Sequence, residues 1–230
     1  MIKNAMSLKG KINNLAKKDK TLPQAVMQTY MLERLLERIS ISEYKDNFIL
    51  KGGMLISSII GIDNRSTMDI QAYFDEMPID LKIDVTAGDK ITYKEINYKY
   101  NLLLEKRSIE IWTYNVETII AEKYESIIKR SILNTRIRDF YDLYMLTHFD
   151  KKNIQNKVLA IAIKETAKHR ETFDIINDRN IVEDVINSIQ NDKSLKEQWN
   201  KYQSSYEYAK DIKYEQLIDS IIAIKEIYFK

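Results

Sequence analysis

Two glycines that follow a short apolar run are the first residues whose type and spacing can do chemistry. Residues 48–50 read as a buried strand, and Gly52 and Gly53 end it where a helix over 54–60 is expected to open. Glycine lets a phosphate approach the backbone N–H groups at the positive end of a helix. The same pair also suits a tight strand-to-helix turn that binds nothing, and such turns are common.

Carboxylates near strand ends are the second chemical signal. Asp69 follows a polar turn over 61–67, and Asp84 lies on the polar face of residues 79–85, whose apolar side chains alternate with a period of two. Two carboxylates on adjacent strands can hold the magnesium ion that bridges the phosphates of a nucleotide. Lys82 shares the face of Asp84, however, and mixed charge is also typical of a half-exposed strand. The residues alone leave both interpretations open.

The second half of the chain contributes a lysine and two aspartates. Lys123 falls within the apolar stripe of a helix expected over 116–130, so it either extends to solvent or serves an anionic ligand or a carboxylate. Asp139 and Asp142 are three residues apart and share a helix face, while Arg138 and Asp142 form an i,i+4 pair. From spacing alone, this second helix is predicted to be a surface helix with ion pairs.

Composition limits the chemistry further. The 230 residues include no cysteine and two histidines, which excludes thiolate catalysis and Cys- or His-rich metal sites. Metal chemistry must therefore use carboxylates, which favours magnesium or manganese. The 36 basic and 34 acidic residues nearly cancel, so only a local basic surface would attract nucleic acid. The N-terminus has no apolar core of a signal peptide, and no stretch is long enough to span a bilayer, so we expect a cytoplasmic protein without membrane contact.

The elements that must position these residues change character along the chain. The pattern predicts one small sheet from strands at 48–51, 71–74 and 79–85, and it is compatible with further strands at 98–104 and 108–112. Helical periodicity marks residues 7–18 and 27–39 before the sheet, and then 116–130, 137–147, 154–168, 181–190 and 217–228. We therefore predict an α+β protein, with a mixed α/β part over 1–115 and a helical part over 116–230.

Five separated motifs, taken together and in order, closely resemble the AbiEii/AbiGii toxin family of bacterial abortive-infection systems. The resemblance covers most of residues 5–147, and it is specific because the motifs agree in both sequence and spacing. They are Lys51-Gly52-Gly53-Met54-Leu55, Arg65-Ser66-Thr67-Met68-Asp69-Ile70, Lys82-Ile83-Asp84-Val85, Ala121-Glu122-Lys123 and Arg136-Ile137-Arg138-Asp139-Phe140-Tyr141-Asp142.

The resemblance implies a nucleotidyltransferase fold of the DNA polymerase β type with a helical C-terminal part. It also implies a phage-defence enzyme that binds a nucleoside triphosphate with magnesium and transfers nucleotide to an acceptor such as tRNA. A cognate antitoxin would be its protein partner. Carried over by position, the phosphate-binding residues would be Lys51, Gly52, Gly53, Arg65 and Ser66, the metal ligands Asp69 and Asp84, and the remaining catalytic residues Lys123, Asp139 and Asp142.

One position departs from the family pattern. The family's first motif continues as Asp-x-Asp and then through a substantial α/β stretch, whereas here Asp69 is followed by Gln71 and directly by a strand-like segment. A neutral amide cannot replace the charge of the second aspartate. The chain therefore reads as internally truncated, and a catalytically degenerate member that only binds nucleotide or antitoxin is the alternative function. A purely structural helical scaffold would leave the order of the motifs unexplained.

Overall fold

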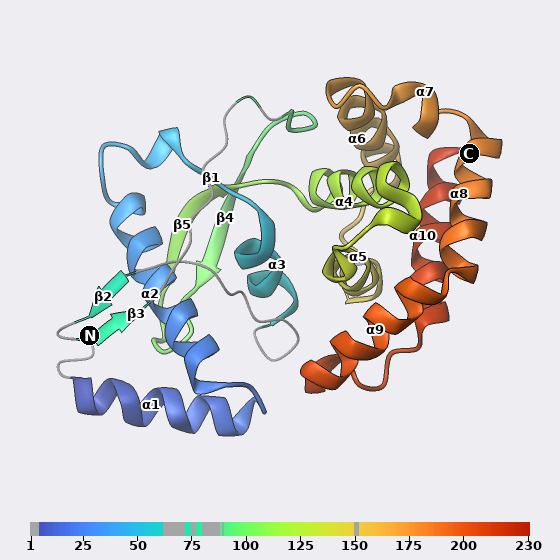
Figure 1. Ribbon diagram of the computed structural model, residues 1–230. Helices are drawn as coiled ribbons and strands as arrows, with labels where there is room; N and C mark the ends of the chain where they lie inside the picture. Colours follow the sequence, from blue (N-terminus) through green and yellow to red (C-terminus); the bar gives the residue numbers. More distant parts are fainter. Residues whose placement is uncertain (1–4, 62–71, 75–76, 80–87, 89, 150–151) are drawn as a thin grey trace. The chain divides into compact units, whose positions relative to one another are not determined.

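The computed structural model describes residues 5–61, 72–74, 77–79, 88, 90–149 and 152–230. The chain forms two compact units. The N-terminal unit comprises Met1–Asp89 and Glu95–Thr113, and the helical unit comprises Lys90–Lys94 and Tyr114–Lys230. Figure 1 shows the helices and strands of both units.

The N-terminal unit combines helices with short strands. Its elements are α1 (Ala5–Lys18), α2 (Pro23–Ser40), the 3-10 turn η1 (Lys45–Asn47), β1 (Ile49–Leu50), α3 (Gly52–Ile60), β2 (Ala72–Phe74), β3 (Met77–Ile79), β4 (Ile96–Asn101) and β5 (Ser108–Thr113).

A three-stranded mixed sheet in the order β1-β5-β4 organises this unit. β1 runs parallel to β5, so that Leu50 lies opposite Thr113, and β4 runs antiparallel to β5. Ile109 and Ile111 of β5 are buried with apolar side chains of α1 and α2 in one core, whereas the alternate residue Glu110 is exposed. The strand alternation thus turns one face of the sheet toward the helices.

Among the described residues, the strand pairing differs from the predicted sheet. Leu50 does belong to a sheet, but its described partner strand is β5, which pairs with β4 on its other side, and neither is among the strands predicted for that sheet at 71–74 and 79–85. Among the described residues, β2 and β3 pair with each other as a separate antiparallel hairpin. β4 and β5 are joined by a short connection, and such neighbours in sequence pair readily. The rest of the predicted strand at 79–85 lies outside the described residues.

The helical unit confirms the prediction that helices follow Val116, because the described residues from there onward contain helices and no strand. Its elements are α4 (Val116–Arg130), η2 (Ser131–Leu133), α5 (Ile137–Phe149), α6 (Asn156–His169), α7 (Phe173–Ile176), α8 (Arg179–Asn191), α9 (Lys193–Ser205), η3 (Glu207–Ala209) and α10 (Tyr214–Tyr228).

α4 is the central helix of this unit and packs against both α5 and α6 (Figure 1). It begins where the side chain of Asn115 accepts a hydrogen bond from the Thr118 N–H, a standard N-terminal cap. Ile120 and Ile127 of its apolar stripe are completely buried. Because α4 is enclosed on several sides, a polar side chain on its inner face must find a partner within the protein.

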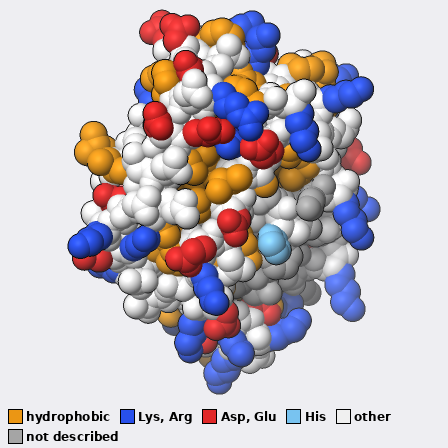
Figure 2. All heavy atoms as spheres, turned by 90° about the vertical axis from the view of Figure 1, so that its right-hand side faces the viewer, with side chains coloured by type: hydrophobic (Ala, Val, Ile, Leu, Met, Phe, Trp, Pro, Cys, Tyr) orange, Lys and Arg blue, Asp and Glu red, His pale blue; other side chains and the backbone are white. Residues whose placement is uncertain are grey.

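The outer surface of the helical unit mixes both signs of charge. On the face that carries α8 and α10, lysine and arginine side chains are interspersed with aspartate and glutamate (Figure 2). No helix among the described residues has the combination of length and apolar character that a bilayer-spanning segment requires.

Candidate active site

A buried ion-pair cluster joins α4 to α5 in the helical unit. The Lys123 Nζ lies 2.7 Å from Oδ1 of Asp139 and 2.8 Å from Oδ2 of Asp142. The Asp142 side chain is 0% exposed to solvent, whereas the side chains of Lys123 and Asp139 are 14% and 16% exposed. The structure therefore brings together the three helical-unit residues predicted from sequence, and one member of the cluster is sealed from solvent.

Of the interpretations open for Lys123, the pairing with carboxylates is the one that the structure confirms. A lysine on a buried stripe is costly unless its charge is matched, and here two carboxylates match it. The cluster thus holds the lysine in one orientation and leaves a partly exposed carboxylate, that of Asp139, beside it.

The surface ion-pair helix predicted from the spacing of Asp142 is wrong, because α4 covers that face of α5 and buries Asp142. Arg138, its expected i,i+4 partner, donates a hydrogen bond to the Tyr206 hydroxyl at 3.1 Å. Its guanidinium also lies over the Tyr206 ring, 5.6 Å from the centroid. On the other side of α5, Phe140 and Tyr141 are completely buried and anchor the helix.

The start of α5 is fixed by Asn134. Its side-chain oxygen accepts the Arg136 N–H at 2.8 Å, and the Arg136 carbonyl accepts the Asp139 N–H at 2.8 Å. Asparagine commonly makes such local bonds at turns and helix starts. This local geometry sets where the first turn of α5 begins and hence where Asp139 faces.

An aromatic cluster that was not predicted from the sequence lies beside Arg138. Tyr206 packs 4.6 Å from Tyr202 and 5.2 Å from Tyr208, measured between ring centroids, and the hydroxyls of Tyr202 and Tyr208 are 3.0 Å apart. These rings come from α9 and the turn that follows it. The sequence signal that could have indicated the cluster is the recurrence of tyrosine at 202, 206 and 208 at the end of a helical segment.

The glycine pair forms a separate feature in the N-terminal unit. Lys51 is extended at the N-cap of α3 and makes no side-chain capping bond, and Gly52 begins the helix with φ +69°. A Cβ added at Gly52 would meet no heavy atom within 4 Å. Backbone conformation, not lack of space, therefore requires glycine here, and the strand-to-helix turn predicted from the sequence is confirmed.

Several predicted site residues lie outside the described part of the chain, namely Arg65, Ser66, Asp69, Gln71 and Asp84. Among the described residues, no group of three or more His, Cys, Asp or Glu side chains is arranged to hold a metal ion. The two predicted metal ligands, Asp69 and Asp84, are both among the residues outside the described part.

Comparison with known proteins shows the family to which this chain belongs. A family model described as nucleotidyl transferase AbiEii toxin, type IV toxin–antitoxin system, matches residues 34–71 and 71–220. Because the match covers more than half of the chain, the protein belongs to this family, as the motifs predicted. The family places it among the nucleotidyltransferase toxins of toxin–antitoxin systems, which implies an antitoxin partner. No curated protein and no solved structure matches the chain significantly.

Proposed function

We propose that this protein is a toxin that binds a nucleoside triphosphate with magnesium and transfers nucleotide to an RNA acceptor such as tRNA. The observation that carries the proposal is the Lys123–Asp139–Asp142 cluster, which lies within the segment that the family model matches. A lysine oriented by carboxylates is suited to contact a triphosphate, because a positioned positive charge stabilises the negative charge of the transferred group.

The burial of each side chain divides the roles within the cluster. Asp142 is inaccessible, so we assign it the positioning of Lys123. Lys123 and Asp139 are partly exposed, and we assign to Lys123 the contact with triphosphate and to Asp139 a contact with the nucleotide or acceptor.

In the N-terminal unit, we assign phosphate binding to the turn at Lys51, Gly52 and Gly53, with Arg65 and Ser66 completing it by family position. A helix start of this kind presents backbone N–H groups and a partial positive charge to an anion. The open space at Gly52 is consistent with close approach of a ligand.

Asp69 and Asp84 are the residues that we expect to hold the metal, since carboxylate oxygens are the ligands that magnesium prefers. Bound there, magnesium would neutralise phosphate charge during transfer. In the transfer itself, the acceptor hydroxyl oxygen forms a bond to the α-phosphorus while the bond to the departing pyrophosphate breaks. The hydroxyl proton must pass to a base, and the neutral side chain of Gln71 is a poor one.

This proton requirement favours a second candidate function, a degenerate member that binds nucleotide or antitoxin without turnover. The two matched segments meet at residue 71, the position where the sequence analysis placed the missing stretch and the lost aspartate. We therefore expect nucleotide binding to survive better than transfer.

A transfer assay tests the proposal. Purified protein is incubated with magnesium, each α-labelled nucleoside triphosphate in turn and total tRNA, and label in the RNA is measured for wild type and Asp84→Ala. Label that depends on Asp84 would establish the transferase function. Binding of a triphosphate without label transfer would establish the degenerate alternative as a nucleotide-binding protein. A folded protein that shows neither activity would refute both the transferase function and a nucleotide-binding role.

A further inference from the structure

A basic groove in the N-terminal unit is not used by the proposed active site. It lies between α1 and the turn that joins β4 to β5, and it has a volume of about 420 Å³. Its lining residues are Lys11, Asn14, Leu15, Lys18, Leu103, Leu104, Glu105 and Lys106.

The α1 wall of the groove is a regular stripe. Lys11, Asn14, Leu15 and Lys18 follow at i, i+3, i+4 and i+7, so they share one helix face beside the buried stripe of the same helix. All three lysines of the groove, including Lys106 from the opposite turn, are exposed. α1 contains no acidic residue, so nothing within the helix offsets their charge.

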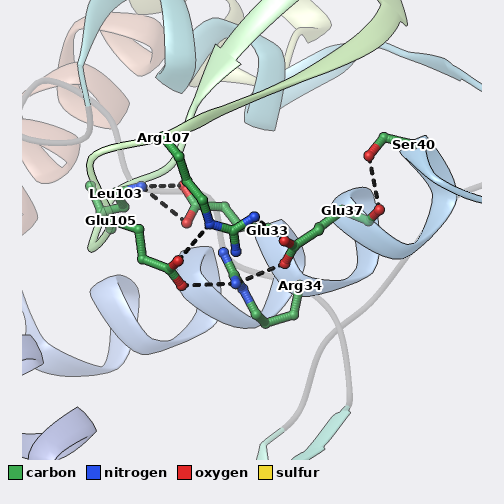
Figure 3. Close-up of polar contacts among 7 residues, drawn as sticks. All are labelled: Glu33, Arg34, Glu37, Ser40, Leu103, Glu105 and Arg107. Carbon is green, nitrogen blue, oxygen red and sulfur yellow. Dashed lines mark hydrogen bonds and ion pairs between the residues drawn. The ribbon is translucent and has the colours of Figure 1, made fainter. Parts of the chain in front are cut away.

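Glu105 is the acidic residue among those that line the groove, and its charge is already matched. Its carboxylate accepts hydrogen bonds from Arg34 at 2.9 Å and from Arg107 at 2.6 Å (Figure 3). The Arg107 hydrogen bond holds the pKa of Glu105 below its ordinary value, with the charge of Arg34 acting in the same direction. Glu37 pairs with the same two arginines, so the network is balanced at two charges of each sign. The three lysines therefore give the groove a net positive charge.

We propose that this groove binds the phosphate backbone of RNA without reading its sequence. Three exposed lysines supply mobile charges suited to phosphates, and half-buried leucines form the floor between them. No lining residue is aromatic, so the groove lacks the stacking platform with which proteins grip bases. Contacts that position a nucleic acid without specifying it have this character.

The choice of RNA over an acidic protein rests on the proposed function, in which the acceptor is an RNA. The net charge of the whole chain is only +2, so long-range attraction to a polyanion is weak. A local cluster such as this one must then supply much of the attraction. The groove thus acts as the surface that holds the acceptor, distinct from the residues proposed to hold the triphosphate.

Fluorescence anisotropy with labelled total tRNA tests the assignment at several salt concentrations. The triple variant Lys11→Gln/Lys18→Gln/Lys106→Gln is compared with wild type. We expect its affinity to fall on the order of tenfold or more at physiological salt, and the salt slope of binding to shrink by about 0.7 for each lost phosphate contact. Circular dichroism checks that the exposed substitutions leave the fold intact.

The matched control is Lys152→Gln/Lys157→Gln/Lys164→Gln, which removes the same charge from exposed positions in the helical unit. It should retain most of the affinity. Equal losses in both triple variants, an unchanged salt slope, or no tRNA binding by wild type would overturn the groove assignment. Labelled polyglutamate bound as tightly as tRNA would overturn it in favour of an acidic protein. The proposed function is judged separately, since triphosphate binding by the groove variant should equal that of wild type.

Discussion

The Lys123 ammonium lies 2.8 Å from the carboxylate of Asp142, which has no solvent exposure at all. An isolated charge in such a position would be strongly destabilising, so the two residues depend on each other. The same lysine also reaches the partly exposed Asp139 at 2.7 Å. The cluster thus links the stability of the helical unit to the residues that we propose contact the nucleotide.

The first prediction concerns that dependence. Lys123→Met should destabilise the helical unit by about 2 to 4 kcal/mol, because it removes the ammonium group that lies 2.8 Å from the buried carboxylate of Asp142. Asp139→Asn should cost less, since Lys123 keeps its buried partner. Urea unfolding followed by circular dichroism measures both changes.

Lys210→Met is the control for this series. Lys210 pairs with Glu207 at 3.5 Å, but both side chains are more than half exposed. Its loss should change stability by no more than about 0.5 kcal/mol. Equal effects of the Lys123 and Lys210 substitutions would show that the buried cluster does not stabilise the fold.

The second prediction concerns Glu33, a buried carboxylate in α2 of the N-terminal unit. Its side chain accepts the Leu103 N–H on both oxygens, at 2.9 and 3.1 Å (Figure 3). Burial raises the pKa of Glu33 to about 8, outweighing the Leu103 hydrogen bond and the nearby Arg34, which act to lower it. The folded protein therefore keeps a proton there that the unfolded chain releases near its ordinary value of 4.5.

Because the folded state binds the extra proton, this contribution to stability is complete below pH 4.5 and is lost as the pH rises toward 8. Relative to wild type, Glu33→Gln should gain on the order of 3 kcal/mol in free energy of unfolding between pH 5 and pH 8. Paired urea titrations at several pH values measure the difference, and the variant cancels the contribution of other titrating groups. Parallel pH profiles for the two proteins would contradict the prediction.

The third prediction compares two glycines that both have room for a Cβ atom but differ in backbone conformation. Gly52 has φ +69°, Gly10 lies within α1, and an added Cβ meets no atom within 4 Å at either. Gly52→Ala should destabilise by about 1 to 2 kcal/mol, whereas Gly10→Ala should be neutral or stabilise by up to about 1 kcal/mol. Thermal unfolding compares them. A stabilising Gly52→Ala would mean that the left-handed conformation is not required.

The helices could be predicted from sequence because their signal is local and long. The stripe over 116–130 coincides with α4, and residues 137–147 fall within α5. The sheet could not be predicted as well. The clearest alternation of apolar and polar residues, at 79–85, was predicted as a main strand of the sheet. The same alternation occurs in β5, at Ile109 and Ile111, but this segment was predicted only as a possible further strand. Pairing depends on which strands meet in space, and periodicity does not contain that information.

In the candidate site, too, local features could be predicted from the sequence, whereas contacts between helices could not. Spacing placed Asp139 and Asp142 on one face of a helix, and the apolar stripe singled out Lys123 as needing a partner. The sequence could not show that Lys123 pairs with Asp139 and Asp142, because this pairing depends on how α4 packs on α5. The stacking of Arg138 on Tyr206 joins residues 68 positions apart, and no local pattern indicates such a contact.

Calorimetric titration of nucleoside triphosphates tests the central claim most directly. Wild-type protein is titrated with each common triphosphate, with magnesium and then with a chelator, beside Asp69→Ala. We predict that at least one triphosphate binds, that binding requires magnesium, and that Asp69→Ala weakens it by about tenfold or more through loss of a metal ligand. If folded wild-type protein binds no triphosphate with or without magnesium, the account of this protein as a nucleotide-binding toxin is contradicted.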